Sequence, residues 1–249
     1  MMKKDLSWLK EAFIAHRGLH TQDGTVPENS LLAFKHAIDG GYAIEMDVNI
    51  LKDGTVVSFH DINLKRLCGV DRGLSDLTLS DLSSYYLQSS QEKIPTLRDV
   101  LNFVNGRVPL LIELKPHGDV KALCQGVMKD LLNYHGTYAI FSFHPRVVYW
   151  FKRHYPDVIR GQIAEYFKDN KTMHPLGKWM MKKMIFNRWT KPDFISYGIR
   201  DLPNPILDKY KQKNMTIISY AARSQAEFDH VKTYYDNVVF EYFIPKQKG

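Results

Sequence analysis

Four short polar clusters lie at the ends of apolar, strand-like runs in this chain of 249 residues. They are His16-Arg17-Gly18, Glu45-Met46-Asp47, His60-Asp61 and Glu113-Leu114-Lys115. A lone histidine at a strand end is usually structural, but four polar clusters on the same kind of element form a pattern. Together they offer histidines, carboxylates, an arginine and a lysine, a combination suited to metal-assisted cleavage of a phosphate ester.

The carboxylates predict a metal site. Glu45 and Asp47 are two residues apart in a predicted strand, so their side chains point to the same face. Two such carboxylates repel each other unless a cation or a proton lies between them. Glu113 adds a third carboxylate and shares a face with Lys115. The alternative is a carboxylate pair at the solvated end of a strand. We favour a divalent metal site, with Mg²⁺ or Ca²⁺ as the ion because oxygen ligands suit these cations better than Zn²⁺.

The two histidines predict acid–base chemistry. His16 and His60 carry the side chain whose ordinary pKa lies closest to neutrality. In the cleavage of a diester, one can take a proton from the attacking hydroxyl while the other protonates the leaving alcohol. Their types and positions do not assign the two parts, and two packed structural histidines are the alternative. Arg17 can bind phosphate oxygens through two nitrogens, or pair with Glu28, and these two roles are compatible.

Apolar, β-prone runs alternate with helix-like segments, which indicates repeated βα units around a parallel sheet. The predicted strands are Ala12–His16, Ala43–Ile50, Thr55–His60, Pro109–Lys115, Tyr138–Phe143, Val158–Ile163, Phe194–Gly198, Met215–Tyr220 and Asn237–Glu241. The predicted helices are Ser30–Asp39, Arg98–Val104, Val120–Tyr134, Pro145–His154, Pro205–Lys213 and Ser224–Tyr235.

Nine strands are one too many for an eight-stranded barrel. The turn Lys52-Asp53-Gly54 is too short for a helical crossover. Either the two strands that flank it are antiparallel, or a terminal candidate lies outside the barrel. The βα alternation also breaks from about Asn63 to Leu97, which we interpret as an insertion into the scaffold.

Composition limits the class of protein. Hydrophobic residues make up 44% of the chain and charged residues 24%, which is typical of globular proteins. No apolar run is long enough to span a membrane, and Met1–Lys10 lacks the apolar stretch of a signal peptide. We therefore expect a single domain over residues 1–249 with a cytoplasmic location. Cys68 and Cys124 are expected to be free thiols.

The net charge of +7 is unevenly distributed. Between Asp169 and Asp193 the chain has no acid but six basic residues, interleaved with tryptophan and methionine. This segment could be a packed helix with solvated lysines, or an apolar cationic lid over a phospholipid-like substrate. On the second interpretation, residues 171–191 make transient contact with a membrane surface. We expect no nucleic-acid partner, because no recognised nucleic-acid motif accompanies these charges.

The ordered set of motifs closely resembles the glycerophosphodiester phosphodiesterase family. The match consists of HRG in Ala12–Gly18, PEN-S in Pro27–Ser30, E-x-D in Gly41–Leu51, DG-x-V-V-x-x-HD in Asp53–Asp61 and E-x-K in Ile112–Lys115. Each motif is weak alone, but their order is specific. The resemblance implies a TIM-type (β/α)8 barrel with a small insertion after the third strand, about residues 63–97.

The resemblance also implies a function and a site. The expected reaction is metal-dependent hydrolysis of glycerophosphodiesters to glycerol 3-phosphate and an alcohol. By this resemblance, Mg²⁺ or Ca²⁺ would bind to Glu45, Asp47 and Glu113, while His16 and His60 would be the acid and base. The substrate phosphate would bind to Arg17 and Lys115.

The carboxyl-terminal third departs from the family pattern. Tyr220 stands where the penultimate strand is expected to carry Trp, and Glu241 stands where the last strand usually ends in Asp. These changes concern the pocket for the leaving alcohol. Two alternatives therefore remain open: lysophospholipase D-type cleavage of lysophospholipids, and non-catalytic binding of phosphorylated ligands or anionic membranes. The sequence fixes neither the alcohol moiety nor the oligomeric state.

Overall fold

The structure is a computed structural model that describes residues 4–168, 171 and 173–246. The chain forms two compact units. The first contains Ile14–Ala139, and the second contains the residues up to Phe13 together with those from Ile140 onward. Within the described residues, no helix is long and apolar enough to cross a membrane.

The Ile14–Ala139 unit is built around the long strand β2 (Ala43–Ile50). On one side β2 pairs in parallel with β1 (Ile14–Ala15), and on the other with β4 (Leu110–Leu114). In the second pairing Asp47 lies opposite Glu113. The short strand β3 (Val56–Ser58) instead pairs antiparallel with β2. The surplus strand is therefore explained by the tight turn at Lys52-Asp53-Gly54, the first of the two alternatives.

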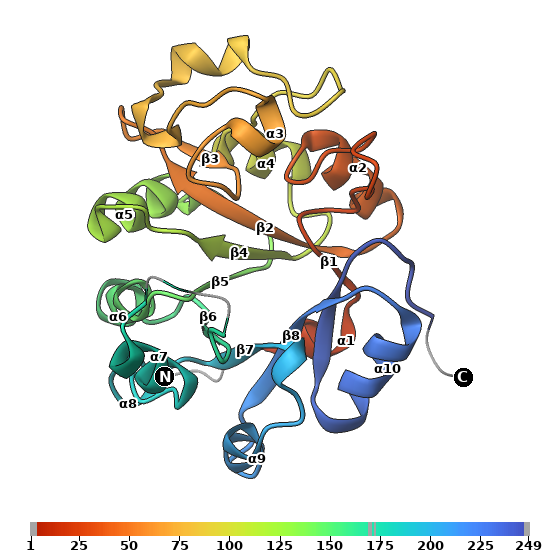
Figure 1. The fold of residues 1–249 in the computed structure, drawn as a ribbon, viewed down its shortest axis with the longest axis vertical. Coiled ribbons are helices and arrows are strands. Elements are labelled where there is room, and N and C mark those ends of the chain that lie inside the picture. The colour runs from red at the N-terminus through yellow and green to blue at the C-terminus, as the bar shows by residue number, and fades with distance from the viewer. Residues whose placement is uncertain (1–3, 169–170, 172, 247–249) are drawn as a thin grey trace. The chain divides into compact units, whose positions relative to one another are not determined.

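Helices cover these strands, and capping residues set where they begin. The helices are α2 (Leu31–Asp39), α3 (Lys65–Cys68), α4 (Leu97–Val104) and α5 (Val120–Leu131). The Ser30 hydroxyl accepts a hydrogen bond from the Ala33 N–H at the start of α2, and Thr96 forms a reciprocal capping box with Asp99 at the start of α4. α2 packs against β2, and α4 packs against α5 (Figure 1).

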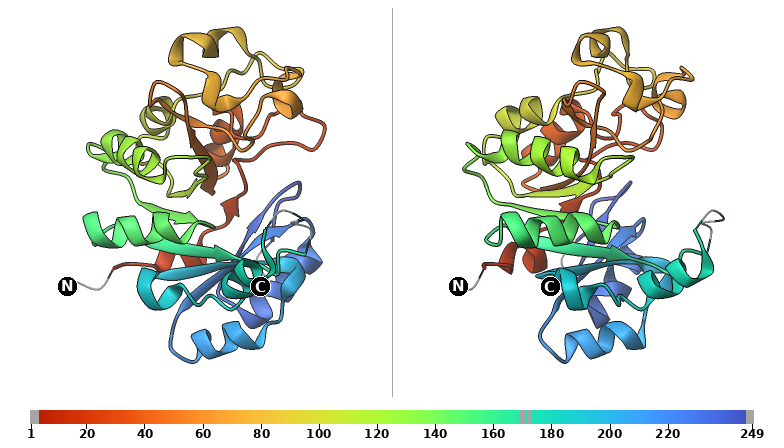
Figure 2. Two further views of the ribbon diagram at one scale, coloured as in Figure 1. Left: turned by 60° about the vertical axis from the view of Figure 1, so that its left-hand side comes forward. Right: turned by 90° about the vertical axis from the view of Figure 1, so that its left-hand side faces the viewer.

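The segment predicted as an insertion follows β3 and leads into α4. Its described residues form α3 and two 3₁₀ turns, Leu74–Asp76 and Leu79–Ser84. Figure 2 shows this segment in yellow and orange from two further directions. Its leucines form a small apolar core with side chains of the scaffold. The cluster consists of Leu51, Val57, Phe59, Leu64, Leu67, Leu74, Leu77, Leu82, Leu87 and Ile94. The segment is thus packed through leucines spaced along an otherwise polar sequence.

The second unit contains a parallel sheet with helices between successive strands. Its strands are β5 (Tyr138–Ser142, from Ile140 onward), β6 (Arg160–Ala164), β7 (Phe194–Gly198), β8 (Thr216–Ala222) and β9 (Asn237–Phe240). Its helices are α1 (Ser7–Glu11), α6 (Pro145–His154), α7 (Pro175–Lys182), α8 (Asn187–Thr190), α9 (Pro205–Lys211) and α10 (Gln225–Tyr234). α10 lies beside β8 and β9 (Figure 1).

Most differences from the predicted elements lie at their ends. The strand expected over Ala12–His16 is reduced to Ile14–Ala15, because Arg17 and Gly18 both adopt positive φ and turn the chain out of the sheet. The helix α1 has no counterpart among the predicted elements. Cys68 and Cys124 are free, as expected.

Candidate active site

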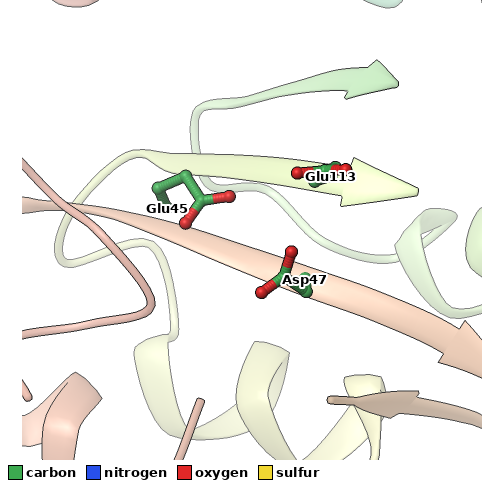
Figure 3. Close-up of side chains that lie close together, drawn as sticks. All are labelled: Glu45, Asp47 and Glu113. Atoms are coloured by element: carbon green, nitrogen blue, oxygen red, sulfur yellow. The ribbon is translucent and has the colours of Figure 1, made fainter. Parts of the chain in front are cut away.

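Three carboxylates meet where β2 and β4 lie side by side. Glu45 and Asp47 project from β2, and Glu113 projects from β4 opposite Asp47. One oxygen from each residue lies within 4.8 Å of the others. Figure 3 shows the three carboxyl groups gathered between the two strands. All three residues are buried, with exposed fractions of 2%, 1% and 8%. The alternative, a carboxylate pair at the solvated end of a strand, is therefore wrong, because these side chains are buried.

This concentration of buried negative charge is only partly compensated. Burial, followed by the charges of Asp47 and Glu113, raises the pKa of Glu45 well above its ordinary value. Burial also raises the pKa of Glu113, with Lys115 acting in the opposite direction. Asp47 differs: burial favours its neutral form, but the cations of Lys115 and Arg17 outweigh burial and lower its pKa.

The donor set fits a divalent metal ion. Asp47 Oδ1 is buried and accepts no hydrogen bond from any described residue. The raised pKa of Glu45 shows that its charged form is disfavoured here, and a bound cation would compensate that charge. Three buried carboxylates, one with an oxygen available, provide the hard oxygen ligands that Mg²⁺ and Ca²⁺ prefer. The cluster could therefore hold such an ion.

Two basic residues flank the carboxylates. Lys115 Nζ donates to Glu113 Oε1 at 3.0 Å and lies 3.5 Å from Asp47 Oδ1. Arg17 Nη1 donates to Glu28 Oε1 at 2.6 Å, while its Nε lies 3.2 Å from Asp47 Oδ2. The sequence offered Arg17 a salt bridge with Glu28 or a role toward phosphate. The structure shows the salt bridge, which leaves the guanidinium beside the carboxylates.

The backbone conformation after β1 places Arg17 beside the carboxylates. Its own N–H donates to Glu45 Oε2 at 3.0 Å, and its φ is +54°. Gly18 follows with a φ of +78°, and a Cβ there would lie 2.8 Å from the backbone carbonyl carbon of Ala33. Glycine is required because both the conformation and the close approach to α2 exclude a side chain.

Asn29 holds Asp47 in place, a role that sequence analysis missed. Ser30, the residue after Asn29, caps α2. Asn29 adopts a φ of +57° and directs its side chain to β2. Its Nδ2 donates to Asp47 Oδ2 at 2.9 Å, and its Oδ1 accepts from the Asp47 N–H at 3.1 Å and from the Ser58 hydroxyl at 3.1 Å. Its place inside the PEN-S motif was the only available signal.

Both candidate histidines lie near this cluster and are partly exposed. His16 Nε2 is 3.9 Å from Glu45 Oε2. The charge of His60 contributes to the lowered pKa of Asp47, which places His60 near the carboxylates. The loop that carries His60 is fixed by Asn49, whose Nδ2 donates to the Phe59 carbonyl at 2.7 Å.

A series of ion pairs begins at His60 and continues through Asp61 and Arg66 to Glu28. Its Nδ1 lies 2.7 Å from Asp61 Oδ1. Arg66 Nε donates to Asp61 Oδ2 at 2.7 Å, and the Arg66 guanidinium also pairs with both oxygens of Glu28. Glu28 in turn holds Arg17. Arg66, from the inserted segment, thus links the His60–Asp61 pair to the Glu28–Arg17 pair. The sequence pattern alone assigns no role to Arg66.

The departures near the carboxyl terminus have partners in the second unit. The Tyr220 hydroxyl donates to Glu165 Oε2 at 3.3 Å, and the Tyr220 ring packs edge-on against Phe143. Glu241 lies just after β9 and accepts from Arg223 Nε at 2.6 Å. Both residues are therefore built into the packing of this unit.

The parallel βα units are those of a TIM-type barrel protein. Its buried carboxylate cluster could hold a metal ion, and two histidines lie near it. The chain belongs to the glycerophosphoryl diester phosphodiesterase family, whose model matches residues 16–238. The family predicted from the motifs is thus confirmed.

Curated relatives match parts of the chain. A glycerophosphodiester phosphodiesterase of Caldanaerobacter subterraneus subsp. tengcongensis is 30% identical over 154 residues, which cover 59% of this chain and 60% of the relative. One from Bacillus altitudinis is 34% identical over 41% of this chain and 43% of its own. The lysophospholipase D GDPD1 of Homo sapiens is 35% identical over 43% of this chain and 37% of its own. These matches span less than two thirds of each relative.

Solved structures match nearly the whole chain. A phosphodiesterase of Oleispira antarctica, in complex with the product sn-glycerol-3-phosphate, has a TM-score of 0.79 at 20% identity and covers 94% of both chains. A glycerophosphodiester phosphodiesterase of Thermotoga maritima has a TM-score of 0.72 at 22% identity, covering 92% of this chain and 94% of its own. The predicted TIM-type barrel is confirmed, with eight parallel strands among the described residues and β3 in addition to them.

Proposed function

We propose that this protein hydrolyses glycerophosphodiesters to glycerol 3-phosphate and an alcohol. The observation that carries the proposal is the buried cluster of Glu45, Asp47 and Glu113 with His16 and His60 beside it. Family membership supports the proposal, as does the complex of one structural relative with sn-glycerol-3-phosphate. We further propose that residues 1–249 act as one barrel domain, with the insertion at about 63–97, and that the protein is cytoplasmic.

The proposed metal ligands are Glu45, Asp47 and Glu113, with Mg²⁺ or Ca²⁺ as the ion. When bound, such an ion polarises a phosphate oxygen and favours attack on phosphorus. Arg17 and Lys115 bind the remaining phosphate oxygens, because both cations already lie beside the carboxylates. They also limit the repulsion between the carboxylates and an approaching anionic substrate.

The proposed acid–base pair is His16 and His60. One histidine removes the proton from a glycerol hydroxyl, and the resulting oxygen attacks phosphorus to form a cyclic phosphate. The other histidine gives its proton to the oxygen of the departing alcohol. Water then opens the ring to give glycerol 3-phosphate. Asp61 favours His60 as the base, since a proton held on Nδ1 by Asp61 leaves a lone pair on Nε2.

Histidine substitutions test the proposal. His16→Ala and His60→Ala should each lower kcat on glycerophosphocholine by roughly 10²–10⁴-fold, the usual contribution of a general acid or base. His135→Ala is a matched control because His135 is exposed and lies after α5, away from the cluster. Undiminished turnover in either site variant would refute the assigned roles.

Lysophospholipids are the second candidate substrate. The observation that favours them is the match to the human lysophospholipase D GDPD1. The same site would cleave them, with the acylated glycerol moiety in place of the free one. Higher kcat/KM on lysophosphatidylcholine than on glycerophosphocholine would favour this alternative, and the reverse order would favour the first. If neither is hydrolysed with Mg²⁺ or Ca²⁺, the chain is better explained as a non-catalytic binder of phosphorylated ligands.

A further inference from the structure

A strongly basic face lies on the second unit, far in sequence from the carboxylate cluster. The segments 145–155 and 173–192 contain no Asp or Glu. Their basic residues are Arg146, Lys152, Arg153, Lys178, Lys182, Lys183, Arg188 and Lys191. These segments form α6, α7 and α8, and α6 packs against α8 (Figure 1). We call this surface, made by residues 145–155 and 173–192, the α6–α8 face.

One hollow of this face is cationic. It has a volume of about 440 Å³, and its lining includes Lys183, Arg188 and Lys191. No ion pair with a described acid neutralises these three residues, so their charge is available to a ligand. Asn187 also lines this hollow. It is only 7% exposed, and its side-chain amide interacts with the Tyr210 hydroxyl, which lines the same hollow.

The charge of this hollow favours an anionic ligand. Lys183, Arg188 and Lys191 line it together, and like charges held close to one another attract a counter-ion. The cationic hollow therefore has the chemistry of a phosphate-binding pocket.

A second hollow of the α6–α8 face is apolar. It has a volume of about 400 Å³ and lies between Tyr149, Met181, Phe186 and Trp189. Lys152 donates to the Trp189 carbonyl at its edge. The neighbouring helix α7 exposes further apolar side chains. In α7, Leu176 is 57% exposed and Trp179 is 52% exposed, and in α8 Trp189 is 54% exposed.

We propose that the α6–α8 face binds the surface of an anionic phospholipid bilayer. The headgroup phosphate occupies the cationic hollow, while Trp179, Trp189 and Leu176 enter the interfacial layer. Tryptophan is enriched at this depth, because its ring is apolar and its N–H remains hydrated. Clustered lysine and arginine are attracted to anionic headgroups. The basic residues of the face therefore favour an anionic partner. The exposed apolar side chains favour a bilayer over a fully polar polyanion.

The proposal refines the expectation of membrane contact through residues 171–191. Residue 172 lies outside the described part of the chain and is not needed. The described surface extends to α6, which the sequence did not connect with the basic segment. No residue of this face belongs to the proposed catalytic site.

Vesicle binding tests the proposal. Purified protein is sedimented with vesicles of phosphatidylglycerol and phosphatidylcholine, or of phosphatidylcholine alone, in EDTA. We expect binding to the anionic vesicles only, with release as salt screens the charges. The double variant Lys183→Glu/Arg188→Glu should weaken binding at least 10-fold. Lys121→Glu/Lys129→Glu, with the same change of net charge on exposed positions of α5, should bind like the wild type.

Fluorescence tests the apolar part of the contact. Brominated phosphatidylglycerol should quench the tryptophan emission of the wild type, and Trp179→Phe/Trp189→Phe should abolish most of this quenching. Equal binding to both vesicle types, or equal loss in the two charge-reversal variants, would overturn the proposal. So would tighter binding to double-stranded DNA than to anionic vesicles at the same salt.

Hydrolysis of soluble glycerophosphocholine is measured on the same wild-type preparation. Hydrolysis without vesicle binding overturns only the membrane proposal. Vesicle binding without hydrolysis supports it and removes the proposed enzymatic function. The two proposals can therefore fail separately.

Discussion

Asn29 and Asp47 form a reciprocal pair between the start of α2 and the strand β2. The Asn29 amide donates to the Asp47 carboxylate at 2.9 Å, and its carbonyl oxygen accepts from the Asp47 backbone N–H at 3.1 Å. One side chain thus fixes both the backbone and the carboxylate of a proposed metal ligand. Asp47 Oδ2 is occupied in this way, whereas Oδ1 is buried and accepts no hydrogen bond from a described residue.

Removal of this amide should weaken the metal site. Asn29→Gly keeps the positive φ without strain, so it deletes the hydrogen bonds alone. We expect metal affinity to fall roughly 10–100-fold, the usual effect of losing a group that orients a ligand. Isothermal titration with Mg²⁺ or Ca²⁺ measures it. Asn105→Gly is the matched control, because Asn105 also has positive φ but is exposed at the end of α4. Equal affinities in the two variants would refute this role.

Metal stabilisation should grow as pH rises. Burial raises the pKa of Glu45 and Glu113, so the folded protein holds these protons more tightly than the unfolded chain. Metal-free stability is then full below the unfolded pKa of about 4.3 and is lost as pH rises toward the folded values. A bound ion replaces the protons and removes this loss. The increase in Tm on adding Mg²⁺ or Ca²⁺ should therefore be larger at pH 8 than at pH 5.

Glu45→Gln supplies the control for this titration. The amide carries no charge, so the metal-free Tm should depend less on pH and should exceed that of the wild type at pH 8. The added ion should have little effect on it. A wild-type Tm increase that stays constant across this pH range would contradict the assigned protonation.

Asp61 should matter for turnover rather than for metal binding. Burial opposes its charge, but hydrogen bonds from His60 and Arg66 outweigh burial and hold its pKa below the ordinary value. Asp61→Asn keeps the shape but removes the charge that orients His60. We expect kcat to fall by roughly 10²-fold or more while metal affinity is retained. Asp39→Asn, in an exposed ion pair with Lys35, should leave kcat unchanged. Equal kcat in both variants would remove Asp61 from the mechanism.

Two glycine substitutions separate backbone strain from close packing. Gly54→Ala meets only the cost of a positive φ, about 1–2 kcal/mol, because a Cβ there contacts nothing within 4 Å. Gly18→Ala adds the clash with Ala33 in α2, for about a further 1–3 kcal/mol of unfolding free energy. Urea denaturation measures both. An equal loss in the two variants would show that α2 moves freely away from residue 18.

Local patterns predicted the elements where one signal dominated. The bounds of β2, β7 and α6 agree with the sequence, because apolar strand runs and the Pro145 helix start mark them. The cluster on β2 and β4 followed from strand alternation. The hydrogen bond between Asn29 and Asp47 could not be predicted from strand alternation, because these residues are in contact only in the folded chain. Arg66 was missed for the same reason: its partners Glu28 and Asp61 come from separate loops.

Hydrolysis by the metal-stripped protein tests the central claim most directly. The protein is treated with EDTA, dialysed and incubated with glycerophosphocholine in the presence of Mg²⁺, Ca²⁺ or no metal, and released glycerol 3-phosphate is measured. We predict release only when a metal is restored, and none from Glu113→Gln, which removes one carboxylate of the cluster. Release that is undiminished without metal, or equal in Glu113→Gln and the wild type, would contradict the proposed site.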